Sequence, residues 1–508
     1  MTEAPTAHAT AAATRESRDR TAIAIMAVGI AALVIRVAGF LAPGALLWTR
    51  ENDDGVMFAG AISMLHGLLP YADFGYVHPP GSLLLLVPFA AWGEATTESV
   101  GLAGARLLTA GVGALNTVLI GILLRRHGVL AILVGAGLYA TWGMAVATER
   151  TYLLEPYLNL GLLIALIVVL RGRRSAPIVA GIALGVALMV KYWAVIDVVL
   201  VGWMIWSRLG RGAVLRYLAA GGITVAAIGL PFLLTDPSAM WQLTVSAQLG
   251  RAGNDVDLAE RADYLSPYFA FPAIRDVVPT AASAAGVVAA LVIAAFPLVG
   301  ALARRARPRA WPPEAWWAIA ALAHAVVLAA SGVSYYHYAV WLMAPLALCL
   351  GATVGSIRRT PARRIVAGGA LAVITLMAVG DVVVIGPRPA ASVVEDWAAD
   401  LECVAGMPSR LVVADHVGAN LDAGCTMDVD PMSLALVMPD ARSLTRERFL
   451  DSDEWRDRWW SYLDGADGAV LDPEEVEWLD DERRESFERE FEVVERIGRL
   501  ELWSRRDR

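Results

Sequence analysis

The 508-residue sequence is poor in lysine and in cysteine. Lys191 is the one lysine, so nearly all positive charge comes from arginine, a usage typical of GC-rich coding that indicates no function by itself. The three cysteines, Cys349, Cys403 and Cys425, do not have the spacing of a zinc site. The sequence also has no internal repeat and no Walker phosphate-binding loop, so nothing in it supports ATP-driven transport.

Apolar residues, by contrast, are abundant. They make up 57% of the chain, and its mean hydropathy is +0.54, whereas a soluble domain has about 45–50% apolar residues. They gather in blocks long enough to cross a hydrocarbon layer about 30 Å thick. The blocks predict about eleven transmembrane helices, near residues 22–42, 101–123, 129–147, 154–170, 176–190, 192–207, 214–234, 280–303, 314–332, 336–356 and 365–386.

The net charge of −8 conceals two parts of opposite sign. Residues 388–508 hold 30 of the 50 acidic and 15 of the 42 basic residues, a balance of −15, and the rest of the chain has a balance of +7. The apolar run from Thr21 to Leu47 is too long for the core of a signal peptide. We therefore predict a disordered cytoplasmic N-terminus (1–21), a transmembrane domain (22–387) and a soluble domain (388–508).

Arginines in the short links between predicted spans indicate the orientation. Five basic links, within 125–126, 171–174, 208–216, 304–309 and 358–364, all fall on the side of the N-terminus if there are eleven spans. Short arginine-rich loops stay in the cytoplasm. The pattern thus predicts a multi-pass protein of the plasma (inner) membrane, with loops 43–100 and 235–279 and the C-terminal domain outside the cytoplasm.

The C-terminal domain has the pattern of a small α/β domain. Arg410 to Asp415 and Gly468 to Leu471 are predicted strands, and the charged stretch from Asp480 to Val494 has apolar residues at helical spacing. Cys403 and Cys425 both lie in this domain, and outside the cytoplasm they could form a disulfide. Cys349 lies in an apolar block and is predicted to be a core residue.

The first outer loop contains a pair of acids, Asp53 and Asp54, just beyond the first span. Apolar stretches at 56–65 and 82–92 are too short to span and predict two helices lying at the membrane interface. A carboxylate at that depth could act as a general base towards a hydroxyl. The alternative is that one of the two aspartates caps the helix that follows.

The surrounding motifs resemble those of the GT-C glycosyltransferases, polytopic enzymes that include protein O-mannosyltransferases and aminoarabinose transferases of lipid A. Four stretches within residues 22–390 carry the resemblance, with Arg106 and Glu155-Pro156 at the starts of spans two and four. They are the acid pair with Phe58 and Met64 to Gly67, Pro70-Tyr71-Ala72-Asp73-Phe74 with His78-Pro79-Pro80-Gly81, Gly181 to Lys191, and Tyr336-His337-Tyr338 with Pro345 to Leu348.

The resemblance implies a mechanism and a fold, an α-helical GT-C-like membrane protein with an extracytoplasmic α/β domain. Asp53 would be the base that deprotonates the acceptor hydroxyl, with Asp54 as its alternate or helper. The oxygen would displace a polyprenyl phosphate with inversion. Lys191 or Arg106 would hold the leaving phosphate, and Arg150, Arg251 and Arg261 are weaker candidates for that role.

Other residues are candidates for binding substrate, each with a structural alternative. Lys191 could instead extend its amine to the interface, and Arg106 could pair with Glu155. His78 could contact sugar or phosphate, or bind a divalent metal with nearby acids, or serve only to hold the backbone. Asp73 could position substrate or close a turn. Tyr336, His337 and Tyr338 could line a donor cavity or form an interfacial aromatic belt.

The leading hypothesis is transfer of a sugar from a polyprenyl-phosphate donor to an envelope glycan, lipid or protein at the outer face of the membrane. Arabinose and mannose are the sugars expected in a high-GC bacterium. One alternative is a lipid-carrier flippase, for which intramembrane charges also fit but matched halves are missing. Another is a non-catalytic assembly protein whose C-terminal domain recruits a glycan or partner. No nucleic-acid partner is expected.

Overall fold

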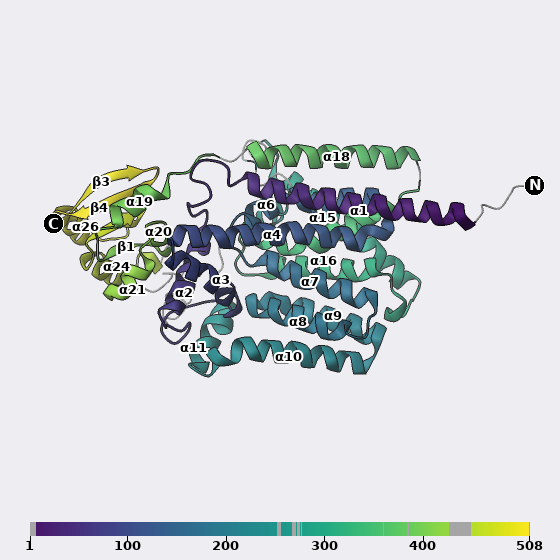
Figure 1. Cartoon of the computed structure of the whole chain (residues 1–508), viewed down its shortest axis with the longest axis horizontal. Coiled ribbons are helices and arrows are strands. Elements are labelled where there is room, and N and C mark those ends of the chain that lie inside the picture. Colours follow the sequence, from purple (N-terminus) through teal and green to yellow (C-terminus); the bar gives the residue numbers. More distant parts are fainter. Residues whose placement is uncertain are drawn as a thin grey trace, which may run out of the picture.

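The computed structural model describes residues 7–250, 256–266, 271, 275, 277–358, 360–383, 386–425 and 449–506. Its long helices run side by side along the longest axis of the molecule, with the N-terminus and the C-terminal domain at opposite ends (Figure 1). Helices lie at all eleven predicted spans: α1 (Ala7–Ala38), α4 (Glu98–Leu124), α5 (Val129–Thr141) with α6 (Gly143–Glu149), α7 (Glu155–Arg171), α8 (Ala176–Val190), α9 (Val195–Leu209), α10 (Arg211–Leu233), α15 (Thr280–Ala303), α16 (Pro313–Ala330), α17 (Ala339–Ser356) and α18 (Thr360–Val383).

The number of membrane crossings is bounded by helix length and composition. Within the described ranges, eight helical segments are long and apolar enough to cross a membrane, and α5 with α6, bent by 56°, would make a ninth. The other two predicted spans, α7 and α8, have 17 and 15 residues; they pack against each other, and α8 also packs against α10. Since several helices can cross a bilayer, the chain is a multi-pass membrane protein.

Contacts between the short links bring basic residues together at one end of the bundle. Arg126, in the turn η1 (Arg125–His127), donates to Glu314 at 2.7 Å. Arg208 lies 3.4 Å from the carbonyl oxygen of Trp311, which follows the turn η4 (Pro308–Ala310). This end is the one at which α4, α9 and α15 finish, far from the C-terminal domain (Figure 1). Which side of the membrane it faces stays a prediction.

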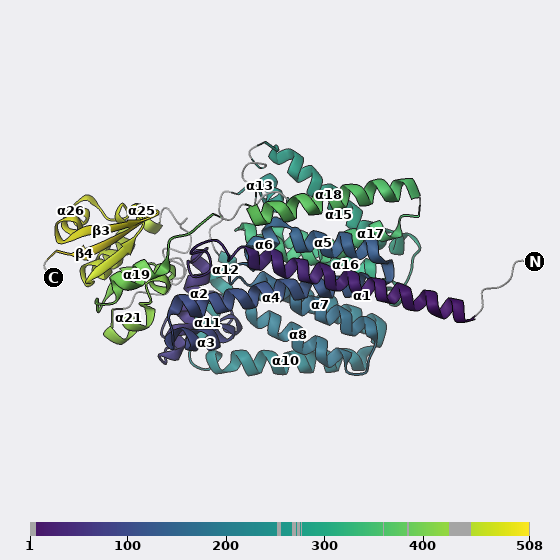
Figure 2. The ribbon, with the colours of Figure 1, turned by 45° about the horizontal axis from the view of Figure 1, so that its top comes forward.

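The two helices predicted in the first outer loop are confirmed as α2 (Asn52–Leu65) and α3 (Gly81–Glu94). They lie where the bundle meets the C-terminal domain, beside the short helix α11 (Figures 1 and 2). Among the described residues, loop 235–279 contains four turns and short helices, α11 included, and two more lie at breaks in the spans. They are α11 (Pro237–Trp241), η3 (Gln242–Ser246), α12 (Ala247–Gly250) and α13 (Leu258–Asp263), with η2 (Tyr192–Ala194) and η5 (Tyr336–Tyr338).

The C-terminal domain is α/β, as predicted. Its sheet has the strand order β1-β2-β4-β3; β1 and β2 are parallel, and the other neighbours are antiparallel. The elements are α19 (Ala391–Ala398), β1 (Val404–Gly406), α20 (Pro408–Val413), α21 (Val417–Ala423), α24 (Asp453–Asp464), β2 (Gly468–Leu471), α25 (Pro473–Val476), α26 (Asp481–Glu490), β3 (Phe491–Ile497) and β4 (Leu500–Arg505).

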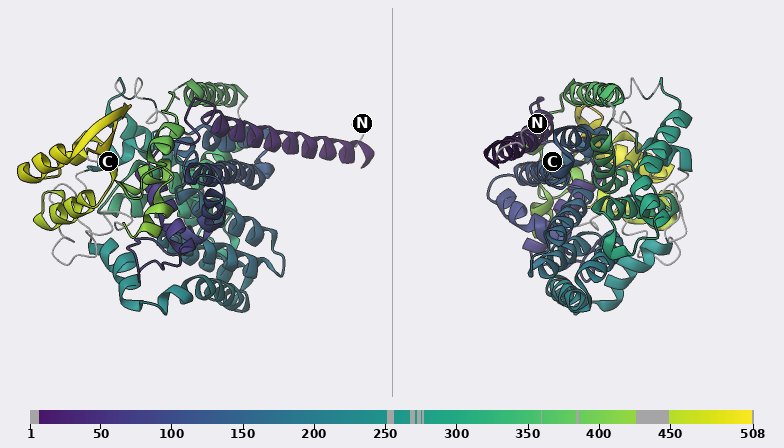
Figure 3. Two further views of the ribbon diagram at one scale, coloured as in Figure 1. Left: turned by 60° about the vertical axis from the view of Figure 1, so that its left-hand side comes forward. Right: turned by 90° about the vertical axis from the view of Figure 1, so that its right-hand side faces the viewer.

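One prediction in this domain is wrong. The stretch from Arg410 to Asp415 is not a strand, because Pro408 starts the helix α20 and the apolar residues that follow are buried in helical form. The strand at 468–471 is confirmed as β2, fully buried, and the charged stretch forms α26 before the chain turns into β3. The domain sits directly against one end of the bundle (Figure 3), and one hydrophobic core contains residues of both.

Candidate active site

The acid pair lies in the first turn of α2. The N-cap residue is Glu51, whose side chain does not form a capping hydrogen bond, and Asp53 and Asp54 follow Asn52 in the first turn. Acidic residues are favoured there by the partial positive charge of the helix N-terminus. The N-cap position is occupied by Glu51, so the alternative in which one of the two aspartates is the N-cap is wrong.

The two aspartates have different surroundings because adjacent residues on a helix point about 100° apart. Asp54 is buried and accepts a hydrogen bond from the Thr151 hydroxyl on Oδ2, while its Oδ1 has no hydrogen-bond partner among the described residues. Burial raises the pKa of Asp54 from 3.8 to about 6, against the opposing effects of Arg106 and Thr151. The Asp53 side chain is 58% exposed, so Asp53 is the member of the pair that a substrate can reach.

The pKa of Asp54 leads to a prediction about stability. The pKa of the Asp54 carboxyl group is higher in the folded than in the unfolded protein, so burying this group costs little folding free energy below pH 3.8. The cost grows as the pH rises from 3.8 to about 6 and is fully present above that. By linkage this cost is on the order of 3 kcal/mol at neutral pH. We expect Asp54→Asn to unfold at a higher temperature than wild type at pH 7 and at a similar temperature at pH 4, in thermal-unfolding curves of purified protein. A constant difference across this range would contradict the prediction.

A line of ionisable side chains leads from Asp53 into the protein. Asp53 Oδ2 lies 4.0 Å from His337 Nε2, and His337 Nδ1 lies 3.1 Å from Glu155 Oε2. The other oxygen of Glu155, Oε1, accepts a hydrogen bond from Lys191 Nζ at 2.6 Å. Glu155, His337 and Lys191 are buried. The structure thus brings together four of the predicted site residues, from α2, η5, α7 and the break between α8 and η2.

Lys191 also faces a cavity. Its ammonium lies 4.5 Å from the centre of the Trp193 ring and 4.2 Å from that of Tyr338, distances typical of cation–π contact. The cavity has a volume of about 520 Å³ and is lined mainly by apolar residues of η2, α9, the end of α16 and loop 235–279. Lys191, Tyr338 and His78 are among the residues that line it. The alternative in which Lys191 only extends its amine to the membrane interface does not account for the hydrogen bond from that amine to Glu155.

Aromatic residues surround this charged group. The Tyr336 hydroxyl donates a hydrogen bond to the carboxylate of Glu51, the residue before α2. Burial raises the pKa of Glu51, and the hydrogen bond from Tyr336 opposes that shift. The ring of His337 is 4.6 Å from the ring of Tyr338 and 5.5 Å from the ring of Tyr336. Tyr336, His337 and Tyr338 therefore line the site as well as lying at a helix end; Glu51 was not a predicted site residue.

Two of the predicted site residues, Arg106 and Asp73, form hydrogen bonds with backbone groups. Arg106 is buried and donates to the carbonyl oxygens of Ala45, Leu46, Trp48 and Arg150 at 2.6–3.1 Å. Since these bonds occupy its guanidinium, Arg106 holds the loop before α2 and is not placed to bind a phosphate, and it does not pair with Glu155. Asp73 closes its own turn by accepting the N–H of Leu69 at 2.7 Å.

The weaker arginine candidates also bind carbonyl groups. Arg261 Nε donates to the carbonyl oxygen of Val256 at 3.0 Å. Arg150 donates to the carbonyl oxygens of Ile35 and Asp381. Arg251 lies outside the described residues.

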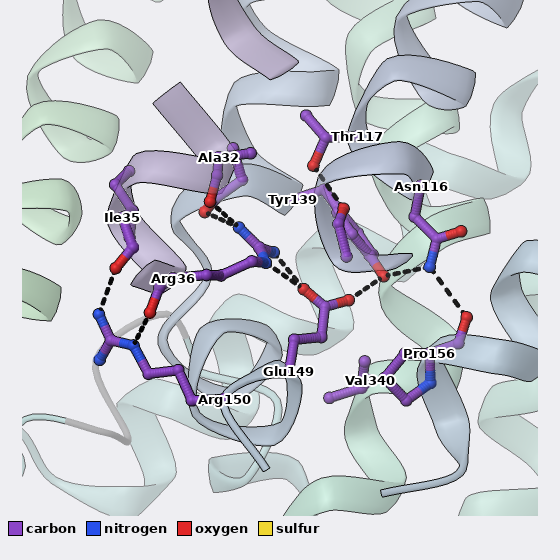
Figure 4. Close-up of polar contacts among 12 residues, drawn as sticks. Ala32, Ile35, Arg36, Asn116, Thr117, Tyr139, Glu149, Arg150, Pro156 and Val340 are labelled. Atoms are coloured by element: carbon purple, nitrogen blue, oxygen red, sulfur yellow. Dashed lines mark hydrogen bonds and ion pairs between the residues drawn. The ribbon is translucent and has the colours of Figure 1, made fainter. Parts of the chain in front are cut away.

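An ion pair inside the bundle was missed by the sequence analysis. Figure 4 shows Arg36 of α1 facing Glu149 at the end of α6, with Arg36 Nε 2.6 Å from Glu149 Oε2. Tyr139 donates to the other carboxylate oxygen at 2.7 Å, and Asn116 of α4 donates to the carbonyl oxygen of Pro156 at 2.9 Å. Arg36 lies inside the first apolar block and Glu149 lies two residues beyond the third. These positions were the available signal, because charges in membrane helices are normally paired.

This ion pair fixes a short segment, 149–155, that holds much of the site. Thr151 donates to Asp54, the Tyr152 hydroxyl donates to the carbonyl oxygen of Ser82 at 2.7 Å, and Glu155 contacts Lys191 and His337. Residues 149 and 150 tie the same segment to α1 (Figure 4). The segment therefore sets the relative positions of α2, α3 and the Lys191 break.

A second buried network braces the walls of the cavity. His324 of α16 lies 2.8 Å from Asp197 of α9 and 3.1 Å from the carbonyl oxygen of Trp341 on α17. The Trp341 indole N–H donates to the other oxygen of Asp197 at 3.1 Å. Because α9 and α16 line the cavity and α17 directly follows the lining residue Tyr338, the network helps to hold the cavity's shape.

The remaining chemical predictions concern metal and cysteine. Within the described ranges, no group of three or more His, Cys, Asp or Glu side chains is arranged to bind a metal ion. Cys403 and Cys425 are thiols in the structure. They lie close together, and the pKa of Cys403 is raised by burial and by its contact with Cys425. The disulfide between them stays a prediction, and Cys349 is buried, as expected for a core residue.

Fold and site together define a polytopic membrane protein whose acidic site lies in the helical bundle, beside the helix α2 on which the C-terminal α/β domain packs. No protein-family model matches the chain, and no curated protein matches its sequence. Its fold is similar to that of ArnT from Cupriavidus metallidurans, bound to undecaprenyl phosphate, with a TM-score of 0.58, 15% identity and coverage of 95% of this chain and 97% of that one.

A second match is the oligosaccharyltransferase of Archaeoglobus fulgidus, in complex with Zn and sulfate. The TM-score is 0.56 at 14% identity, and the alignment covers 92% of this chain and 71% of that one. At these identities the similarity shows the fold alone: the chain has the fold that these two solved structures share, as the resemblance in the sequence implied.

Proposed function

We propose that this protein is a membrane glycosyltransferase that transfers a sugar from a polyprenyl-phosphate donor to an acceptor hydroxyl. The observation that carries the proposal is the arrangement of an exposed carboxylate, Asp53, and a cavity-lining cation, Lys191, at the two ends of one charged line. A base at one end and a cation at the other are the two groups that substitution at a sugar phosphate requires. The similar fold of ArnT supports the same reaction class.

In the proposed reaction, Asp53 accepts the proton of the acceptor hydroxyl as its oxygen attacks the anomeric carbon. The new C–O bond forms on the face opposite the phosphate, and the bond from the anomeric carbon to the phosphate oxygen breaks, so configuration inverts. The electron pair leaves with polyprenyl phosphate. The His337 imidazole lies 4.0 Å from Asp53, beside the base.

The leaving phosphate would bind at Lys191, where polar side chains such as His78 and Tyr338 also line the mainly apolar cavity. An ammonium has three N–H donors; one donates to Glu155, and the others can face the phosphate. The apolar wall of α9 and α16 suits a polyprenyl chain, and the site faces the outer leaflet if the arginine-rich links are cytoplasmic. The acceptor would be an envelope glycan, lipid or protein, and arabinose and mannose are the sugars to test first.

The test uses full-length protein purified and reconstituted into vesicles. Polyprenyl-phosphate mannose and polyprenyl-phosphate arabinose, each labelled in the sugar, are supplied with envelope extract as acceptor. The proposal predicts labelled acceptor and released polyprenyl phosphate for one of the sugars. Movement of intact donor across the vesicle membrane without transfer would overturn it and favour a flippase.

A further inference from the structure

The C-terminal domain and the helix that carries Asp53 share one hydrophobic core. Val56 and Met57 of α2 belong to the same buried cluster as Leu411 and Val412 of α20. The two helices approach so closely that a Cβ atom at Gly55 would overlap the Cα atom of Ser409. Ser409 also contacts the start of α2 directly, because its hydroxyl donates to the Asn52 side-chain oxygen at 3.1 Å. The domain therefore packs on the first turns of α2.

Two acids, Asp415 of the domain and Glu98 of α4, join the domain to α4, because each accepts backbone N–H groups of the other element. Asp415 Oδ1 accepts the backbone N–H of Glu98, at the start of α4, at 2.7 Å. The Glu98 carboxylate is buried and accepts the N–H groups of Val417 and Gly418, at the start of α21, at 3.1 and 2.8 Å. Each acid thus satisfies backbone donors of the other element, which would be costly to leave unpaired once buried.

The backbone conformation of Asp415 limits which residues can replace it without strain. Its φ is 56°, in the left-handed region, which asparagine and aspartate tolerate better than other residues with a side chain. Asparagine could keep both this conformation and the bond to Glu98, because its amide oxygen is an acceptor. Alanine would lose the bond and be strained.

Two outer contacts complete the interface. The Ser99 hydroxyl donates to Glu395 of α19 at 2.6 Å. His66, just after α2, lies 3.0 Å from both Asp422 of the domain and Glu94 of α3. The contacts thus surround α2: its N-terminal end, its buried face and its C-terminal end each touch the C-terminal domain or an element fixed by it.

From this geometry we infer that the C-terminal domain positions the acid pair, and that Asp415 is a positioning residue for the reaction of Asp53. The inference rests on the proposed transfer reaction for its kinetic consequence. The domain holds α2 from outside, and segment 149–155 holds it from inside through Thr151. A shift of Asp53 by about 1 Å away from the acceptor would slow the reaction by up to a hundredfold.

The test compares three full-length variants. Asp415→Ala removes the acceptor for Glu98, and Asp415→Asn keeps it. Asp480→Ala is the matched control, because Asp480 accepts a helix N–H in the same domain, from Arg483 at 2.9 Å, at the start of α26. We expect Asp415→Ala to lower kcat by at least about tenfold with little change in the KM for donor, and the other two variants to stay within about threefold of wild type.

Hydrogen exchange supplies a second readout that does not depend on activity. Peptides covering 52–65 should exchange faster in Asp415→Ala than in wild type or Asp480→Ala, while peptides of β2 and β4 stay protected. Unchanged exchange in α2, or an equal loss of kcat in Asp480→Ala, would overturn the inference. If wild type itself transfers no sugar, the proposed function fails, and the exchange of α2 still decides whether the domain positions that helix.

Discussion

Replacing Asp53 with asparagine is expected to lower the kcat of sugar transfer by about 10³-fold, within the range that a general base supplies. Asparagine has nearly the same shape as aspartate but does not accept a proton at neutral pH. Because the Asp53 side chain is 58% exposed and 4.0 Å from His337, the substitution removes no buried hydrogen bond. We therefore expect the KM for donor and the unfolding temperature to stay close to wild type.

Two other aspartates of the same loop serve as controls. Asp54→Asn should keep most of the activity, since an amide oxygen can still accept the hydrogen bond from Thr151. Asp73→Asn should also remain active, because Asp73 closes a turn through the N–H of Leu69 and is not among the residues that line the cavity. Full activity of Asp53→Asn with loss of activity in Asp54→Asn would exchange the roles of the pair.

Helical spacing does not separate the two aspartates. The residues three, four and seven positions after Asp53 are Val56, Met57 and Gly60, and all are buried, as are Met57, Phe58 and Ala61 at the same positions after Asp54. The sequence analysis treated the pair as a unit and chose Asp53 from the family motif. The exposure of the Asp53 side chain adds an independent physical reason for the same choice.

The spans and the outer helices were predictable because each depends on a local pattern, a long or a short run of apolar residues. The strand at 410–415 was predicted wrongly because a short apolar run fits a buried strand and a buried helix equally well. Pro408 was the signal for the helix, since proline is favoured in the first turn.

The partners of the buried charges were harder to predict, because they depend on contacts between distant parts of the chain. Arg36 and Glu149 are 113 residues apart, and Asp415 and Glu98 are 317 apart. Arg106 illustrates the same limit: its position in the sequence suited a phosphate, but in the fold its donors reach the carbonyl groups of the loop before α2. A sequence reports that a buried arginine needs acceptors, and the fold decides which ones.

Lys191→Gln is expected to impair both donor binding and stability, for separable reasons. Without the ammonium, the leaving phosphate loses its cation in the cavity, and we expect kcat/KM for donor to fall by about 10²-fold or more. Glu155 would also remain buried with only His337 beside it. Removing one partner of a buried pair costs about 3–5 kcal/mol, so the unfolding temperature should fall as well.

The double variant Lys191→Gln with Glu155→Gln separates the two effects. It contains no lone buried charge at this position, so its unfolding temperature should recover towards that of wild type. Its kcat/KM should stay low, because glutamine offers the phosphate no positive charge, whereas Lys191→Arg should retain part of the activity. Thermal unfolding and donor kinetics on the same preparations measure both quantities. If the double variant transferred sugar at the wild-type rate, Lys191 would serve only to neutralise Glu155, and the leaving phosphate would have to be held elsewhere in the cavity.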